Sequence, residues 1–160
     1  MKIYVLTLSR VFPTTHPRKG DRTDFNEKIL NARYEMLNRP MKLHTIRANY
    51  ELWRRRFDEI DAGIACLSLR QWSGLPYRSK QVEMQRLTHE DGIGLQKLWF
   101  MADVYGVNRL ENPVIDYSER YYPGAIARND GLEYNDWKEW FKNYDLSKPL
   151  AIIHFTKFRY

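Results

Sequence analysis

The chain has 160 residues, 26 of them Lys or Arg and 20 Asp or Glu, which gives a formal net charge of +6. This length predicts one domain spanning residues 1–160 with a hydrophobic core, and 43% apolar residues exclude global disorder. No apolar run reaches the ~18 residues of a membrane span and no signal-peptide core is present, so we expect a cytoplasmic protein with no membrane partner.

The cysteine content and the distribution of charge limit the kinds of cross-link and of partner that we expect. The single cysteine, Cys66, excludes an internal disulfide and lies in an apolar run typical of a buried strand. Residues 1–20 contain four Lys or Arg and no acid, and residues 42–80 contain eight against four acids. This asymmetry favours an anionic partner such as nucleic acid, although a solvated basic surface has the same composition.

The first third of the chain predicts a strand, a loop and a helix. Residues 2–8 are rich in strand formers, and residues 9–23 form a basic, proline-containing loop. Asp24 and Glu27 have the spacing of a capping box, which predicts a helix from there to about Leu37.

The middle of the chain alternates strands with one helix. Residues 42–47 alternate as a strand does, and Asn49 then caps an amphipathic helix that Gly63 ends. Residues 64–69 and 77–87 predict two strands of a hairpin joined by a turn at 72–76.

The last third contains a strand at 95–100, a loop with a short strand over 101–127, an aromatic helix over 133–144, and a closing strand over 150–158. Five or six strands with about three helices in mixed order predict an α+β fold, a small mixed β-barrel or curled sheet flanked by helices. Residues 9–23 and 93–125 are expected as additional loop material.

Several common chemistries lack their motifs in this sequence. No Walker or dinucleotide-binding glycine pattern is present, and the four histidines do not have metal-ligand spacing. We therefore expect no cofactor and no metal. His16 and His89 are interpreted as loop residues, and His154 as a core or edge histidine on the closing strand.

The candidate site combines Lys42-x-x-Thr45-x-Arg47 with the acid of Asp130-Gly131. Arginine offers a planar fork for carbonyls or phosphate, lysine a point charge, threonine a hydroxyl, and the acid an acceptor for an amine. Together these groups suit recognition of a polar ring.

A second candidate is the predicted hairpin, where cations alternate with aromatic residues. Such a turn contacts phosphates while a ring stacks on a base, or else its aromatic residues cover one end of the fold and its cations stay solvated. The residues concerned are Arg70, Trp72, Tyr77, Arg78 and Lys80.

The segment Lys42-Leu-His-Thr-Ile-Arg47 resembles the Lys-Thr-x-Thr-x-Arg signature of ASCH domains, which belong to the PUA-like superfamily. Asn129-Asp130-Gly131-Leu132, the aromatic helix and the closing strand resemble that family's later segments, in the same order. The resemblance covers about half of the chain. Asp130 stands where the family has a longer Glu, and Arg39-Pro40-Met41 replaces its Gly-Lys approach.

The resemblance implies a PUA-like barrel with a cleft that binds RNA or a modified nucleotide or nucleoside. One bacterial branch of the family removes the acetyl group from acetylcytidine. By that resemblance Lys42, Thr45 and Asp130 form the catalytic set and Arg47 contacts the substrate. Three functions stay open at this stage: nucleotide binding, hydrolysis of an N-acylated cytidine-like substrate, and an interaction module for an acidic protein. The sequence leaves the oligomeric state open.

Overall fold

The computed structural model describes residues 1–160 and has an α+β fold with seven strands and four α-helices. The elements in chain order are β1 (Lys2–Thr7), α1 (Phe25–Arg33), β2 (His44–Arg47), α2 (Tyr50–Asp61), β3 (Ala65–Trp72), β4 (Gln81–Leu87), the short 3-10 helix η1 (His89–Asp91), β5 (Gly94–Ala102), β6 (Asn108–Ile115), α3 (Pro123–Asn129), α4 (Tyr134–Phe141) and β7 (Leu150–His154).

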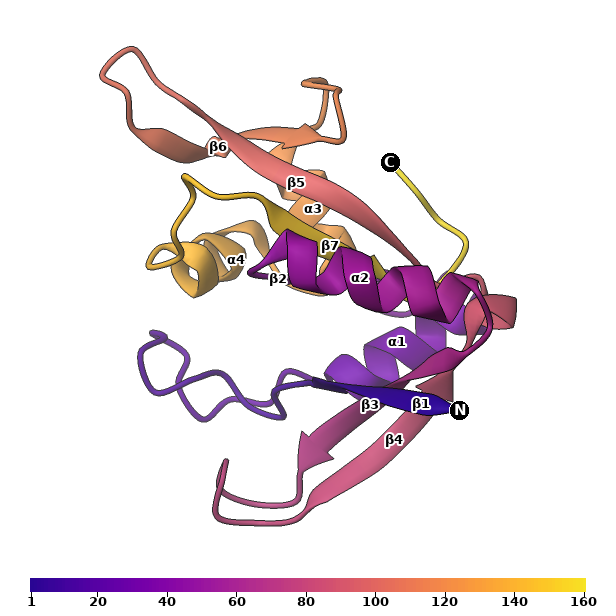
Figure 1. Ribbon diagram of the computed structural model, residues 1–160. Coiled ribbons are helices and arrows are strands. Elements are labelled where there is room, and N and C mark those ends of the chain that lie inside the picture. Colours follow the sequence, from indigo (N-terminus) through magenta and orange to yellow (C-terminus); the bar gives the residue numbers. More distant parts are fainter.

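The strands lie in two sheets. Three strands pair in the order β1-β3-β4, with β1 parallel to β3 and β4 antiparallel to it. The other four pair antiparallel in the order β2-β7-β5-β6, and this sheet is curled as a half-barrel. Figure 1 shows α2 between the two sheets, and α4 on the same side of the molecule as the β1–α1 loop and the tip of the β3–β4 hairpin.

β7 is the centre of the molecule because all five of its residues are buried. Its alternate side chains enter two separate cores. Ala151 and Ile153 pack with the three-stranded sheet and α2, whereas Leu150 and Ile152 pack with α3 and α4. A strand buried on both faces appears in the sequence as a continuous apolar run, which is the pattern seen here.

Several local predictions are confirmed. The Asn49 side chain accepts a hydrogen bond from Leu52 N at 3.2 Å and caps α2, and Gly63 follows that helix with φ +74°. The β3–β4 hairpin, β5 and the aromatic helix α4 are present, and Cys66 is buried in β3. Residues 9–23 form a loop that contains a single β-bridge.

The first helix differs from its prediction at both ends. The Asp24 side chain does not cap α1, because its carboxylate binds Arg22 instead. The helix ends at Arg33 and not at Leu37, since Glu35 has a positive φ of 53°. The Asn31 side chain also donates to Pro40 O at 2.9 Å and folds the following segment back along the helix.

The strand predicted at 95–100 is present as β5, but the expectation of extra loop over the rest of 93–125 is wrong, since the eight-residue strand β6 and the start of α3 lie there. Two prolines made β6 and the start of α3 difficult to recognise in the sequence. Pro113 is tolerated because β6 is the edge strand of its sheet, and Pro123 occupies the first turn of α3, where no backbone N–H is needed. The count of strands is therefore seven and not five or six.

Three strand boundaries also differ. β2 begins at His44, two residues after Lys42, and β4 begins at Gln81, because residues 77–80 belong to the turn. β7 ends at His154, after which the chain turns back, and Tyr160 N donates to the Gln96 side chain at 2.9 Å. None of the helices combines the length and the apolar content that crossing a membrane requires.

Truncation of Ile152 in β7 tests the role of this strand. Ile152 is fully buried, so Ile152→Ala leaves a cavity and is expected to lower the free energy of unfolding by about 2–5 kcal/mol. Urea denaturation measures this loss. The control is Ile64→Ala, whose side chain is 60% exposed, and which should change stability by less than about 0.5 kcal/mol. Equal losses in the two variants would contradict the central position of β7.

Candidate functional site

The end of α3 and the segment that leads into β2 are joined by hydrogen bonds. Leu43 N donates to Asn129 O at 2.7 Å, and the Lys42 ammonium donates to Asp130 O at 2.5 Å and to Asp130 Oδ1 at 2.6 Å. Leu43 O in turn accepts from Phe155 N, just beyond β7. The two segments predicted to share a site therefore meet.

Gly131 places Asp130 at this position by ending α3. It has φ +79°, and Leu132 N folds back to donate to Ala127 O at 3.0 Å, as in a glycine-terminated helix. A Cβ at Gly131 would lie 3.0 Å from the Lys42 Cβ, so a larger residue would crowd the lysine. The helix thus ends with its last carbonyls and the Asp130 carboxylate facing a cation, which is favourable at a helix C-terminus.

Lys42 and Asp130 form an ion pair that is almost completely buried, with side chains only 1% and 3% exposed. The Lys42 ammonium also lies 4.1 Å from the centre of the Phe25 ring. Burial lowers the pKa of Lys42 to about 8, although the Asp130 carboxylate opposes the change. Burial raises the pKa of Asp130, and the positive charges of Lys42 and then Arg47 oppose that rise.

Arg47 is anchored by three hydrogen bonds. Its Nη1 donates to Thr45 Oγ1 at 2.9 Å and to Ile46 O at 3.0 Å, and its Nη2 donates to Thr7 O at 2.8 Å in the other sheet. Burial lowers the pKa of Arg47, but a guanidinium retains its charge at neutral pH. Nε and the second N–H of Nη2 make no hydrogen bond within the protein, so they remain as donors.

These four side chains line one cavity of about 550 Å³, which is within the usual size of small-molecule sites. Its walls come from the end of β1 and the loop after it, the start of α1, β2, the β3–β4 turn, the residues after α3, and α4. The lining residues are Thr7, Leu8, Ser9, Arg10, Val11, Phe12, Pro13, Thr14, Phe25, Lys42, Thr45, Arg47, Trp72, Gly74, Leu75, Pro76, Tyr77, Asp130, Leu132, Trp140, Phe141 and Tyr144.

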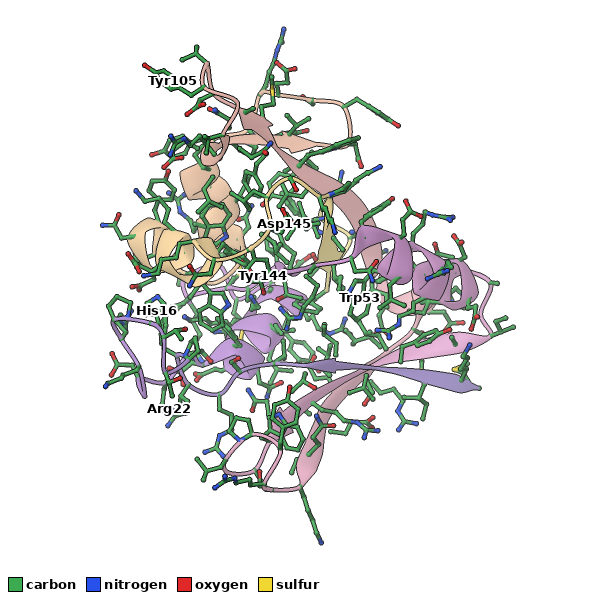
Figure 2. All side chains as sticks on the ribbon, turned by 60° about the vertical axis from the view of Figure 1, so that its left-hand side comes forward. His16, Arg22, Trp53, Tyr105, Tyr144 and Asp145 are labelled. Carbon is green, nitrogen blue, oxygen red and sulfur yellow. The ribbon has the colours of Figure 1, made fainter.

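Aromatic rings form much of this lining. Trp72 and Tyr77 contact each other in the turn, with ring centres 5.2 Å apart, and Tyr77 is 90% exposed. On the opposite wall Trp140 packs against Phe12 and Phe25. Tyr144, labelled in Figure 2, follows α4 and lines the cavity together with Phe12 and Pro13 of the β1–α1 loop.

The structure brings some of the predicted site residues together and leaves others apart. Trp72 and Tyr77 line the cavity with the Lys42 group, but the three hairpin cations do not. The Arg70 Nε donates to Ser68 Oγ on β3 at 2.9 Å, and Arg78 and Lys80 are exposed on the turn. Those three cations therefore do not line the cavity, although Arg78 and Lys80 lie on the same turn as Tyr77.

Sequence reasoning missed the contributions of the β1–α1 loop and of α4. Arg10 and Phe12 were predicted only as parts of a loop, and Trp140 and Tyr144 only as parts of an aromatic helix. The available signal was the basic composition of the loop and the number of aromatic residues in the helix. Neither feature shows which elements face each other.

Three of the four histidines, His16, His44 and His154, make hydrogen bonds that hold neighbouring segments together. His44 is buried, shares a 2.6 Å hydrogen bond with Tyr160 Oη, and lies behind the ion pair with Nδ1 4.0 Å from Asp130 Oδ1. Burial holds the pKa of His44 well below its ordinary value. His154 bonds to Gln96 and is a core histidine, and His16 fixes its loop to α4 through Asp136 O. No three His, Cys, Asp or Glu side chains converge to hold a metal ion.

Comparisons with protein-family models, with curated proteins and with solved structures found no match for this chain.

Neutralising Asp130 tests the buried ion pair. Asp130→Asn leaves the Lys42 ammonium buried without a countercharge, so the free energy of unfolding should fall by about 3–5 kcal/mol. Urea denaturation at pH 7 measures the change. The double variant with Lys42→Met should recover much of the loss, because no unpaired charge then remains.

The matched control for this experiment is an exposed ion pair on α4. Glu139 binds Lys142 at 2.6 Å, and both side chains are at least 40% exposed. Glu139→Gln should cost less than about 1 kcal/mol. A similarly small loss in Asp130→Asn would contradict the burial of the Lys42–Asp130 pair.

Proposed function

We propose that the chain is an ASCH-type domain of the PUA-like kind, and that its cavity binds a nucleobase of RNA or of a free nucleotide. The observation that carries this proposal is the convergence of Lys42, Thr45, Arg47 and Asp130 in one cavity. The curled four-stranded sheet is compatible with a PUA-like fold.

The free hydrogen-bonding positions in the cavity suit the edge of a base. Lys42 occupies Asp130 Oδ1 and the Trp137 side chain also stabilises the carboxylate, but a carboxylate has about four acceptor positions, so Asp130 can still accept from an exocyclic amine. Thr45 Oγ1 accepts from Arg47, which leaves the threonine hydroxyl hydrogen free to donate. The unused donors of Arg47 can donate to ring nitrogens or carbonyls of a base. Acceptor and donors side by side match the polar edge of a nucleobase and not an aliphatic ligand.

The aromatic lining provides the faces of such a site. Rings stack on an unpaired base whatever its sequence, and the exposed ring of Tyr77 at the turn is available for this. The surrounding cations attract the phosphate groups of the same ligand. A ligand with a flat polar ring and a phosphate therefore uses every kind of group that the cavity and its surroundings offer.

Removal of one exposed ring tests this function. Stacking on a base is worth about 1–3 kcal/mol, so Tyr77→Ala should weaken binding of single-stranded RNA by about 5- to 150-fold. Fluorescence anisotropy with a labelled ten-nucleotide RNA of mixed sequence measures the affinity. The control is Tyr105→Ala, since Tyr105 is 86% exposed at the far tip of the β5–β6 hairpin.

Both tyrosines are exposed, so neither substitution is expected to unfold the protein. The same titration at two salt concentrations should show a steep loss of affinity with salt, because phosphate contacts release counterions. Equal affinities of the two variants would contradict the assignment of the cavity. No RNA binding, together with salt-independent binding of an acidic protein, would instead favour the interaction module.

A second function, hydrolysis of an N-acylated cytidine-like substrate, is favoured by one observation. Burial brings the pKa of Lys42 to about 8, close to neutrality, in the same cavity as the Thr45 hydroxyl. A lysine that loses its proton there can accept one from threonine, whose oxygen then attacks the acyl carbon. The acyl–nitrogen bond breaks, the amine leaves with a proton, and water releases the acyl group as a carboxylic acid.

Acetylcytidine tests this second function. Deacetylation followed by chromatography should rise with pH through about 8, because the neutral lysine is the base. Lys42→Met should abolish turnover, whereas Lys148→Met, which changes an exposed lysine, should not. Absence of turnover by the unaltered protein from pH 6 to 10 (about the range in which lysine bases act) would exclude hydrolysis and leave binding.

A further inference from the structure

A second hollow of about 300 Å³ adjoins the cavity and shares two of its lining residues. Arg10 and Val11 line both hollows, so only this short stretch of the β1–α1 loop separates them. The other residues of the second hollow come from the end of the β1–α1 loop, the start of α1, β3 and β4, and they are Arg22, Asp24, Asn26, Glu27, Gln71 and Met84.

Arg10 is fixed at the boundary between the two hollows. Its Nη1 donates to Ser73 O at 2.7 Å and to Trp72 O at 3.4 Å, which holds the side chain against the β3–β4 turn. Nε and Nη2 make no hydrogen bond within the protein, and the exposed guanidinium forms no salt bridge. A guanidinium that is already positioned and has two free nitrogens suits a phosphate group.

The second hollow suits the uncharged part of a nucleotide. The charge of Arg22 is matched by Asp24 at 3.0 Å, and the Glu27 carboxylate has no partner. A free carboxylate repels phosphate but accepts hydrogen bonds from ribose hydroxyls or from an exocyclic amine. Gln71 adds an amide that both donates and accepts.

The two chain segments around these hollows are strongly basic. Residues 9–22 and 70–80 together contain seven Lys or Arg and one acid, Asp21. The cations are Arg10, Arg18, Lys19, Arg22, Arg70, Arg78 and Lys80. Figure 1 shows that the two segments project on the same side of the molecule. Arg18 pairs with Asp21 and Asp136 and Arg22 pairs with Asp24, so the cations without an acid partner are Arg10, Lys19, Arg70, Arg78 and Lys80.

From this arrangement we propose that the ligand is a nucleotide strand that spans both hollows. One base enters the large cavity, the phosphodiester that follows it binds Arg10, and the neighbouring nucleotide occupies the second hollow. This inference rests on the proposed function, because it takes the large cavity as a base site. It adds that a free nucleotide fills only part of the binding site.

A series of ligands of increasing length tests the proposal. The probes are the four ribonucleosides, their 3′- and 5′-monophosphates, and the dinucleoside monophosphates ApA, CpC, GpG and UpU, titrated by calorimetry. For the base that binds best, a phosphate should increase affinity about tenfold or more through Arg10. The dinucleoside monophosphate should bind more tightly than either monophosphate.

Substitutions test which residues cause each increase in affinity. Arg10→Gln should remove the increase caused by the phosphate, and Gln71→Ala with Glu27→Ala should remove the further increase caused by the second nucleotide. Nucleoside affinity should stay within about threefold in the Gln71 and Glu27 variants, since neither residue lines the large cavity. The control is Arg54→Gln, whose side chain is exposed on α2 and binds Glu51 and Asp58.

The possible results distinguish the base site in the large cavity from the nucleotide strand that spans both hollows. If a nucleoside binds but the dinucleoside monophosphate binds no more tightly than the monophosphates, the strand proposal is overturned and the base site stands. If no nucleoside, nucleotide or dinucleotide binds, the proposed function itself fails.

Discussion

The Lys42 ammonium is almost completely buried, and the surrounding structure depends on the protein groups that interact with it in place of water. Moving an ion of this size out of water costs several kcal/mol even after relaxation. The carboxylate and the backbone carbonyl of Asp130, just after α3, and the face of the Phe25 ring offset this cost. Asp130 directly follows α3, Phe25 begins α1 and Lys42 precedes β2, so the ion pair requires that these three segments meet at one point.

The same constraint determines the chemistry of the cavity. Lys42 occupies one oxygen of Asp130, and Arg47 makes two hydrogen bonds within β2 and one to Thr7 O, which holds β2 against β1. The positions that remain free are therefore few, fixed in place, and gathered on one wall. Buried charges of this kind shift pKa values and are concentrated at functional sites more often than in ordinary cores. A pair of apolar residues would stabilise the same junction at least as well.

The local parts of this architecture could be predicted from the sequence. The cap at Asn49 and the helix stop at Gly63 depend on neighbouring residues, and the structure has them as expected. A strand is also present at β2, but it begins at His44 and does not show the alternation predicted over 42–47. The contact of the Lys42 segment with Asp130, which the resemblance to ASCH domains implied, is also present.

The parts that could not be predicted depend on contacts between distant elements. β6 contains Pro113, which is tolerated because β6 is the edge strand of its sheet. The sequence does not show which strand will lie at the edge. The β1–α1 loop packs against α4, and His16 of the loop bonds to Asp136 of the helix, 120 residues later in the chain. Arg10 and Phe12 of the loop and Trp140 of the helix therefore line the same cavity. Spacing rules do not reach across such a distance.

The most direct test of the central claim is a two-dimensional ¹H–¹⁵N NMR titration of the labelled protein with single-stranded RNA. If the cavity built around the Lys42–Asp130 pair holds a base, the largest shift changes will fall on backbone amides of residues 8–14, 45–47, 72–77 and 130–132. Amides at the tip of the β5–β6 hairpin, near Tyr105, will remain unchanged. Changes confined to that tip, or no changes in the four segments at saturating RNA, would contradict the account.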